Sequence, residues 1–180
     1  MKKCLSALVF GALTVVAGSV TAQESDYAGI DAKTVAQIQK APSQVPGDVV
    51  LAAIERRIWA GTHFSDNLVH PGGQGPLGKR DRMLGFASYG PFQGGHALFN
   101  CFGPGDRFTS TYSDCEGGGD TPVGRPIIGF VASVQLPGTM PLYRCYQIIP
   151  GKNNHFDSFD PNCEGKRAAV NEGVLGYMWL

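Results

Sequence analysis

Residues 96–102 (HALFNCF), 105–119 (GDRFTSTYSDCEGGG) and 127–138 (IIGFVASVQLPG) carry a pattern that the chain uses more than once. A second copy follows, with MPLYRCY at 140–146, NNHFDSFDPNCEG at 153–165 and VLGYMWL at 174–180. A more divergent copy precedes both, with AAIERRIW at 52–59, GTHFSDNLVHPGG at 61–73 and MLGFASYGPFQG at 83–94. Matching positions such as Ile54, Leu98 and Leu142 are 44 residues apart. We therefore expect three copies of one unit, each burying its apolar face against its neighbours, over residues 44–91, 92–137 and 138–180.

The units are predicted to be built from β-strands. In the second unit, strand-like stretches cover residues 97–102, 107–112 and 126–134, and glycine and proline separate them. Three such units favour an all-β, pseudo-threefold closed architecture, because closure leaves no exposed strand edge. A β-trefoil is the first expectation and a small propeller-like barrel the second.

Four of the five cysteines fall inside the units: Cys101, Cys115, Cys145 and Cys163. In the first unit the matching positions hold Arg57 and Pro71, so both members of a pair are absent together. This joint absence favours disulfides within units, Cys101 to Cys115 and Cys145 to Cys163, among the three pairings that four cysteines allow. A metal site is the competing interpretation, but the clustered Cys and His spacing that it needs is missing.

The N-terminal residues predict export. Lys2 and Lys3 precede an apolar stretch at residues 5–20, and small residues lead up to Ala22. This is typical of a secretory signal peptide, residues 1–22, cleaved near Ala22. Export to a periplasmic or extracellular space, which is oxidising, agrees with the predicted disulfides.

A leader of residues 23–43 is expected between the signal peptide and the β domain. It contains the one good helical candidate, residues 31–40, where Asp31 can cap the start and Ala41 and Pro42 end the helix. We expect this leader to pack on the outside of the β domain or to be held loosely.

The charge balance excludes several classes of partner. Fifteen basic residues balance 15 acidic ones, and removal of Lys2 and Lys3 leaves a net charge of about minus two. We therefore expect no nucleic-acid binding. No second apolar stretch is long enough to suggest membrane insertion. We expect one monomeric domain without a cofactor or metal.

Several motifs resemble a secreted bacterial and fungal repeat family of unknown function, whose units read PLYRxY, GDHFYT and EGxxGY. The third unit matches best, with PLYRCY at 141–146, NHF at 154–156 and EGVLGY at 172–177. GDRFT at 105–109 matches in part and GTHF at 61–64 weakly. The resemblance implies an accessory, glycan-binding role and carries over no catalytic residues. The chain departs from the family by placing cysteines in the first strand of two units.

Polar residues just before and after a repeated phenylalanine are the candidate ligand-binding positions. His63, Arg107 and His155 occupy one matching position and stand beside small polar residues. Such groups bind sugar hydroxyls, while an aromatic face stacks on the ring. The candidates are His63, Arg107, His155, Asp106, Asn154, Asp157, Trp59 and Tyr146, with Tyr112, Phe159 and Trp179 as further aromatic platforms. The alternative is structural: Phe64, Phe108 and Phe156 would be core anchors and their neighbours would line hairpins.

Function remains divided between classes. No nucleophile or metalloenzyme motif is present, so catalysis is the least favoured class. A pair of carboxylates for glycoside cleavage is defined by its separation in space, so it would leave no motif in the sequence. A carbohydrate-binding module for the cell wall or extracellular polysaccharide is the first expectation. A protein-binding or protease-inhibitor module is the second, with residues 148–150 and 72–80 as its candidate loops.

Overall fold

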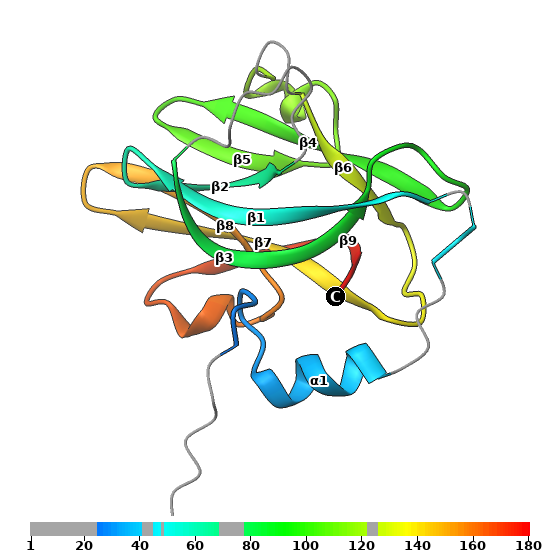
Figure 1. Cartoon of the computed structure of the whole chain (residues 1–180). Helices are drawn as coiled ribbons and strands as arrows, with labels where there is room; N and C mark the ends of the chain where they lie inside the picture. The colour runs from blue at the N-terminus through cyan, green and yellow to red at the C-terminus, as the bar shows by residue number, and fades with distance from the viewer. Residues whose placement is uncertain (1–24, 41–44, 48, 69–77, 122–125) are drawn as a thin grey trace, which may run out of the picture.

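The computed structural model describes residues 25–40, 45–47, 49–68, 78–121 and 126–180 (Figure 1). Within these ranges the protein is mostly β, with nine antiparallel strands and one α-helix. The elements are α1 (Ala32–Lys40), β1 (Leu51–Trp59), β2 (Thr62–Asn67), β3 (Lys79–Ser88), β4 (Gly95–Gly103), β5 (Asp106–Ser110), β6 (Ile127–Ala132), β7 (Thr139–Ile149), β8 (Lys152–Ser158) and β9 (Val170–Trp179), with short 3₁₀ turns at Cys115–Gly117 and Cys163–Gly165. The predicted strands of the second unit are confirmed to within two residues at every end.

The strands form three groups with the same internal pairing: unit 1 is β1–β3, unit 2 is β4–β6 and unit 3 is β7–β9. In each unit the first strand pairs with the second and with the third. The registers correspond, since Ile54 pairs with Gly85, Leu98 with Gly129 and Leu142 with Gly176, and a bulge follows each of these pairs.

The units join through their third strands. Single antiparallel bridges link Ser88 to Phe130, Ala132 to Tyr177, and Phe86 to Trp179. The pairings give one open nine-stranded sheet in the order β2-β1-β3-β6-β9-β7-β8, with β4 paired to β5 and β6. The predicted all-β character is confirmed in this coarser form, whereas a trefoil or closed barrel is not shown.

The hairpin turns follow from local sequence. β4 and β7 each end at a Pro–Gly turn, where proline fixes a negative φ and glycine takes the positive φ that a type II turn requires. Gly105 has φ +76° and Gly151 has φ +82°. The first hairpin instead turns at Ala60 and Gly61, which both have positive φ, as in a type I′ turn.

Apolar residues at matching positions of the three units meet in one core. Ile54, Leu98 and Leu142 are essentially unexposed, as are Leu84, Val131 and Met178. The N-terminal segment adds to this cluster through Ala28, Ile30 and Val35, and α1 lies along the lower edge of the molecule in Figure 1. Residues 25–40 are therefore packed against the β domain.

The predicted helix is confirmed as α1. The Thr34 backbone N–H donates to the Asp31 carboxylate at 3.0 Å, which satisfies one of the donors left open at the helix start. Val35 is the buried residue of its inner face. None of the described helices is long and apolar enough to cross a membrane.

Both predicted disulfides are confirmed, Cys101 to Cys115 and Cys145 to Cys163. The four sulfurs lie in the buried interior. Two disulfides in one small domain indicate an oxidising location, extracellular or periplasmic. The predicted signal peptide lies outside the described residues.

Replacing Cys145 and Cys163 together by alanine is expected to lower the free energy of unfolding by about 3 kcal/mol, because the unfolded chain regains the entropy of an 18-residue loop. Urea denaturation measures this change. Val134→Ala, at a residue that is 63% exposed, is the control and should change stability by less than about 0.5 kcal/mol. An equally small effect of the double replacement would contradict the structural role of the disulfide.

Candidate functional site

The second strands of the three units meet at one buried carboxylate. Asp157 on β8 accepts hydrogen bonds from the hydroxyls of Ser65 on β2 and Thr109 on β5. Asp157 is only 2% exposed, and burial raises its pKa above the ordinary aspartate value. These three residues occupy the matching position two places after His63, Arg107 and His155. They hold the units together and leave Asp157 no access to a ligand.

A second layer of contacts also joins neighbouring units, at two of the three junctions. Both the backbone N–H and the ring Nδ1 of His63 lie 2.9 Å from Asn154 Oδ1. The backbone N–H and Nδ1 of His155 contact Asp106 Oδ2 at 3.1 and 2.6 Å. His63 of unit 1 thus contacts β8 of unit 3, and His155 of unit 3 contacts β5 of unit 2. At both places the predicted ligand-binding side chains are used to join units.

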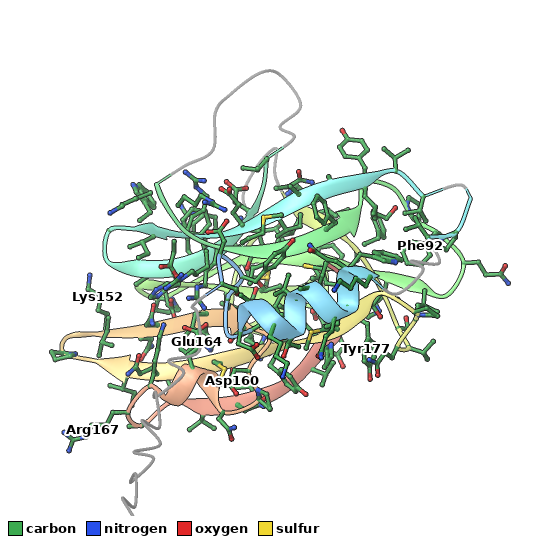
Figure 2. All side chains as sticks on the ribbon, turned by 60° about the horizontal axis from the view of Figure 1, so that its bottom comes forward. Phe92, Lys152, Asp160, Glu164, Arg167 and Tyr177 are labelled. Carbon is green, nitrogen blue, oxygen red and sulfur yellow. A yellow bond between two sulfur atoms is a disulfide. The ribbon has the colours of Figure 1, made fainter. Side chains whose placement is uncertain are left out.

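Arginines from two first strands reinforce these junctions. Arg56, 2% exposed, contacts Asp81 at 2.6 Å and makes a bidentate contact with Glu164. Arg144 contacts Glu116 at 2.6 Å and Glu172 at 2.8 Å. Figure 2 shows Glu164 close to Asp160, whose carboxylate accepts a hydrogen bond from the Glu164 backbone N–H at 2.9 Å. Unit 3 is thereby bound to unit 1, and unit 2 to unit 3.

The glutamates reach their arginines because of an unusual backbone. Cys115 and Glu116, like Cys163 and Glu164, have φ between 53° and 60°, and each pair is followed by a glycine with positive φ. Left-handed conformations cost roughly 1–2 kcal/mol at a non-glycine residue. The disulfide at the first residue of each turn ties this strained segment to the first strand of its own unit.

Hydrogen bonding and charge keep the junction between units 2 and 3 ionised. The hydrogen bond from Arg144 lowers the pKa of Glu116. Burial alone would raise the pKa of Glu172, but hydrogen bonding and charge from His155 and the charge of Arg144 lower it. Burial would likewise lower the pKa of His155, but hydrogen bonds to Asp106 and Glu172 raise it to about 9. Near neutral pH these groups are therefore charged and paired.

The junction between units 1 and 2 is built differently. Asn100 stands where the other units have Arg56 and Arg144, and no ion pair to Arg107 forms among the described residues. The Arg107 guanidinium lies instead over three rings, at 4.2 Å from the centroid of Phe102, 4.5 Å from Trp59 and 4.8 Å from Phe64. Burial lowers the pKa of Arg107, and the charge of Asp66 partly offsets this.

A pocket of about 290 Å³ opens over this aromatic cage. Its lining includes Trp59, Thr62, Phe102, Asp106 and Arg107. Trp59 is 49% exposed, whereas Arg107 is 7% exposed. We call this the Trp59 pocket. It joins an accessible indole face to a buried cation.

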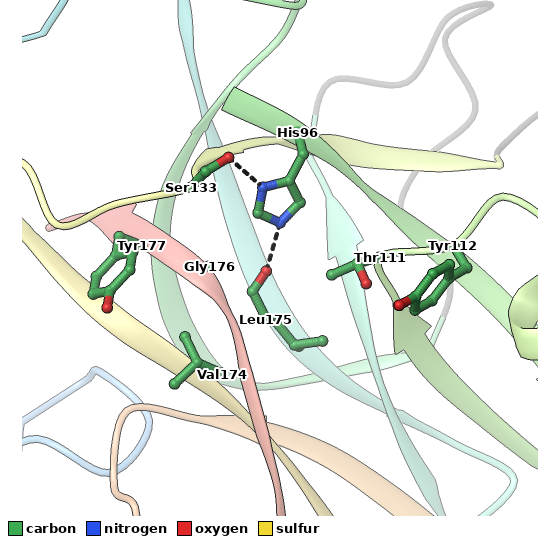
Figure 3. Close-up of a pocket in the computed structure, with 8 residues that line it drawn as sticks. All are labelled: His96, Thr111, Tyr112, Ser133, Val174, Leu175, Gly176 and Tyr177. Carbon is green, nitrogen blue, oxygen red and sulfur yellow. Dashed lines mark hydrogen bonds between the residues drawn. The ribbon is translucent and has the colours of Figure 1, made fainter. Parts of the chain in front are cut away.

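A larger groove of about 580 Å³ lies between units 2 and 3 (Figure 3). His96 Nε2 donates to the Leu175 carbonyl at 2.8 Å, and its Nδ1 lies 2.9 Å from the Ser133 hydroxyl. The exposed Tyr112 and Val174 form the other end, which continues into a smaller pocket beside Glu116, Arg144 and Glu172. We call the larger cavity the His96 groove.

The structure brings three of the predicted site residues into one pocket, Trp59, Asp106 and Arg107. It places the others in the junctions: His63 and Asn154 between units 3 and 1, His155 against Asp106, and Asp157 where β2, β5 and β8 meet. Tyr146 packs on the His155 ring, with ring centroids 4.8 Å apart.

Two of the further aromatic platforms are ruled out by burial. Phe159 is 2% exposed and Trp179 is 1% exposed, so both belong to the core. The junction arginines and glutamates were not predicted from the sequence. The available signal was the recurrence of Arg and Cys–Glu–Gly at matching positions, 56 with 144 and 115–117 with 163–165.

Among the described residues, no three His, Cys, Asp or Glu side chains are grouped so that they could hold a metal ion. Comparisons with family models, curated proteins and solved structures found no match.

His155 is expected to make stability depend on pH. Its pKa rises from an ordinary 6.5 to about 9 on folding, so its stabilisation is complete below about pH 6.5 and is lost as the pH rises through about 9. Urea denaturation at about pH 6 and about pH 10 should show that His155→Gln costs more stability at the lower pH. A cost that does not change with pH would contradict the assigned ion pairs.

Replacing Arg56 by methionine is expected to cost about 3–5 kcal/mol, because it leaves Glu164 and Asp81 without the buried cation. Arg144→Met is the matched variant. Its side chain is 14% exposed against 2% for Arg56, so water screens more of the loss and the cost should be smaller. Equal and small costs in urea denaturation would show that the arginines do not hold the junctions.

Proposed function

We propose that the protein is a secreted carbohydrate-binding module and that the Trp59 pocket binds the sugar. The observation that carries the proposal is the pairing of an exposed indole with a buried guanidinium in one cavity. The guanidinium of Arg107 contacts rings and no carboxylate partner among the described residues. A buried group with five N–H donors gains most from a ligand that offers hydroxyl or carboxylate oxygens.

The geometry of the pocket suits a sugar ring. Carbohydrates present an apolar C–H face, which stacks on aromatic rings, and a rim of hydroxyls, which need fixed polar partners. Trp59 supplies the ring at the pocket mouth, and Thr62 and Arg107 supply polar groups below it. The Asp106 carboxylate accepts a hydrogen bond from the Arg107 backbone N–H at 2.7 Å and contacts His155. Its side chain therefore has a fixed position in the pocket lining.

The three junction glutamates do not suit the role of a general acid in glycoside cleavage. Glycoside cleavage by two carboxyl groups requires one of them to be protonated as a general acid. The pKa values of Glu116, Glu164 and Glu172 are all lowered, so these carboxyl groups are ionised at neutral pH. Each is also bound to an arginine or histidine of a neighbouring unit.

The proposed architecture behind this site is a closed, pseudo-threefold arrangement of three copies of one unit. It is supported by the matching registers and by the cyclic order of the bridges, unit 1 to 2, 2 to 3 and 3 to 1. The resemblance to secreted repeat proteins supports the same assignment. On this view the junction between units 1 and 2 lost its ion pairs and became the binding site.

The alternative, a protein-binding or inhibitory module, has one observation in its favour. Ile148, beside the β7–β8 turn, is 71% exposed, so a large apolar side chain is accessible to a partner in one of the two predicted loops. The other predicted loop, residues 72–80, lies mostly outside the described residues.

The proposal is tested with a glycan array probed by the mature, disulfide-bonded protein. Binding to one class of glycan is expected, and Trp59→Ala should weaken it at least about tenfold, because stacking aromatics dominate such sites. Tyr89→Ala is the matched control: Tyr89 is 50% exposed but lies at the opposite end of unit 1, so binding should persist. Arg107→Lys keeps the charge but removes the planar fork, and it should weaken binding more than Tyr89→Ala does.

Two outcomes would overturn the proposal. The first is no glycan binding at any tested concentration. The second is binding that Trp59→Ala and Tyr89→Ala weaken equally, since this would place the sugar elsewhere.

A further inference from the structure

The chain's own N-terminal segment fills one of the junctions as an added strand. Tyr27 forms a parallel bridge with Met83 on β3, outside the β1–β3 pairing. The Ala28 N–H donates to the Met83 carbonyl at 2.8 Å, and the Met83 N–H donates to the Asp26 carbonyl at 2.9 Å. On the other side, Phe159 N–H donates to the Ala28 carbonyl at 3.0 Å. The segment therefore lies between β3 and the residues that follow β8.

The His96 groove is the matching place between units 2 and 3. Val174 on β9 corresponds to Met83, since Tyr143 pairs with Val174 as Glu55 pairs with Met83, directly after the first bulge of each unit. Thr111, which follows β5, corresponds to Phe159. Among the described residues, no segment other than β7 bridges to Val174, and its side chain is 48% exposed. The groove of about 580 Å³ is open where Asp26–Ala28 would lie.

We propose that the His96 groove binds an extended peptide segment of a partner protein, which adds to the edge of β9 as a parallel strand in the way that residues 26–28 add to β3. Strand addition uses main-chain hydrogen bonds for affinity and side-chain pockets for selectivity. Here the Val174 N–H and carbonyl supply the main-chain pair, and the Thr111 N–H supplies a donor from the opposite wall. This site is separate from the Trp59 pocket and does not depend on the proposed carbohydrate binding.

The lining of the groove defines the chemistry of the partner. In the filled junction, Asp26 forms an ion pair with Arg80. In the open groove Asn171 replaces that arginine, and the same end is bordered by Glu116, Glu172 and Arg144, so that two carboxylates face one guanidinium. A basic side chain one position before the bridging residue would therefore meet negative charge.

Polar residues replace apolar ones deeper in the groove. His96, Thr111 and Ser133 stand where the filled junction has Met140, Phe159 and Leu180 (Figure 3). A partner residue at the position of Ile30 should accordingly be small and hydrogen-bonding, such as serine. The chain's own segment, which carries an acidic residue first and isoleucine later, matches the filled junction and not the open one.

The test uses a synthetic octapeptide based on residues 24–31 with Asp26→Arg and Ile30→Ser. The peptide is acetylated, labelled with a fluorophore and titrated with the full, disulfide-bonded protein by fluorescence anisotropy. Saturable one-to-one binding is expected. Methylating the peptide nitrogen at the position of Ala28 removes one main-chain hydrogen bond and should weaken binding about five- to tenfold.

Protein variants locate the bound peptide. Val174→Arg places a positive charge on the exposed edge, near the expected position of the peptide's arginine, and should weaken binding of the substituted peptide at least about tenfold. Trp59→Ala, in the separate sugar pocket, is the matched control and should leave peptide affinity unchanged. The peptide with the unaltered sequence of residues 24–31, which carries aspartate in place of the arginine, should bind at least about tenfold more weakly than the substituted one.

Changes in backbone NMR chemical shifts show which of the two grooves the peptide occupies. Shifts at His96, Thr111 and Val174 support the proposal. Shifts at Met83 and Phe159 would mean that the peptide has displaced the chain's own segment, and they would overturn it. The proposal also fails if no saturable binding occurs at millimolar peptide, or if N-methylation and Val174→Arg leave the affinity unchanged.

Discussion

The fold depends on the contacts through which each unit of strands holds the next. Each unit is a three-stranded sheet too small to bury its own apolar face, so the junctions between units carry the stability of the domain. At two junctions a buried or half-buried arginine meets a glutamate from the neighbouring unit. A buried cation that loses its partner is costly, so these pairs favour one relative placement of the units over sliding alternatives.

The disulfides stabilise these contacts indirectly. Each one fixes a Cys–Glu–Gly turn whose first two residues have left-handed backbone conformations, and the middle residue of that turn is the glutamate that reaches across the junction. The covalent bond within a unit thus places the charge that binds the next unit. Units 2 and 3 both contain this combination of a disulfide, a strained turn and an ion pair.

The three junctions are related but have different capacities for function. Between units 3 and 1 the ion pairs are complete and the N-terminal segment fills the adjoining groove. Between units 2 and 3 the ion pairs are complete but the groove is open. Between units 1 and 2 aromatic rings replace the acidic partners of the buried arginine. A sugar pocket and a peptide groove are therefore proposed at the two junctions that are not fully occupied.

Much of the fold could be predicted from the sequence because matching residues recur at a fixed spacing. Joint absence of cysteines at Arg57 and Pro71 predicted both disulfide pairings, and Asp31 predicted the start of α1. The sites were less predictable. His63 and His155 have the same chemistry in the sequence whether they bind a ligand or a neighbouring unit, and only the positions of Asn154 and Asp106 distinguish the two.

The most direct test of the account is an NMR titration of the indole N–H signals with the glycan that binds best on the array. The chain has two tryptophans, Trp59 at the pocket mouth and Trp179 in the core. The Trp59 signal should shift and saturate while the Trp179 signal stays in place. Binding that leaves Trp59 unmoved would contradict the claim that the junction between units 1 and 2 is the carbohydrate site.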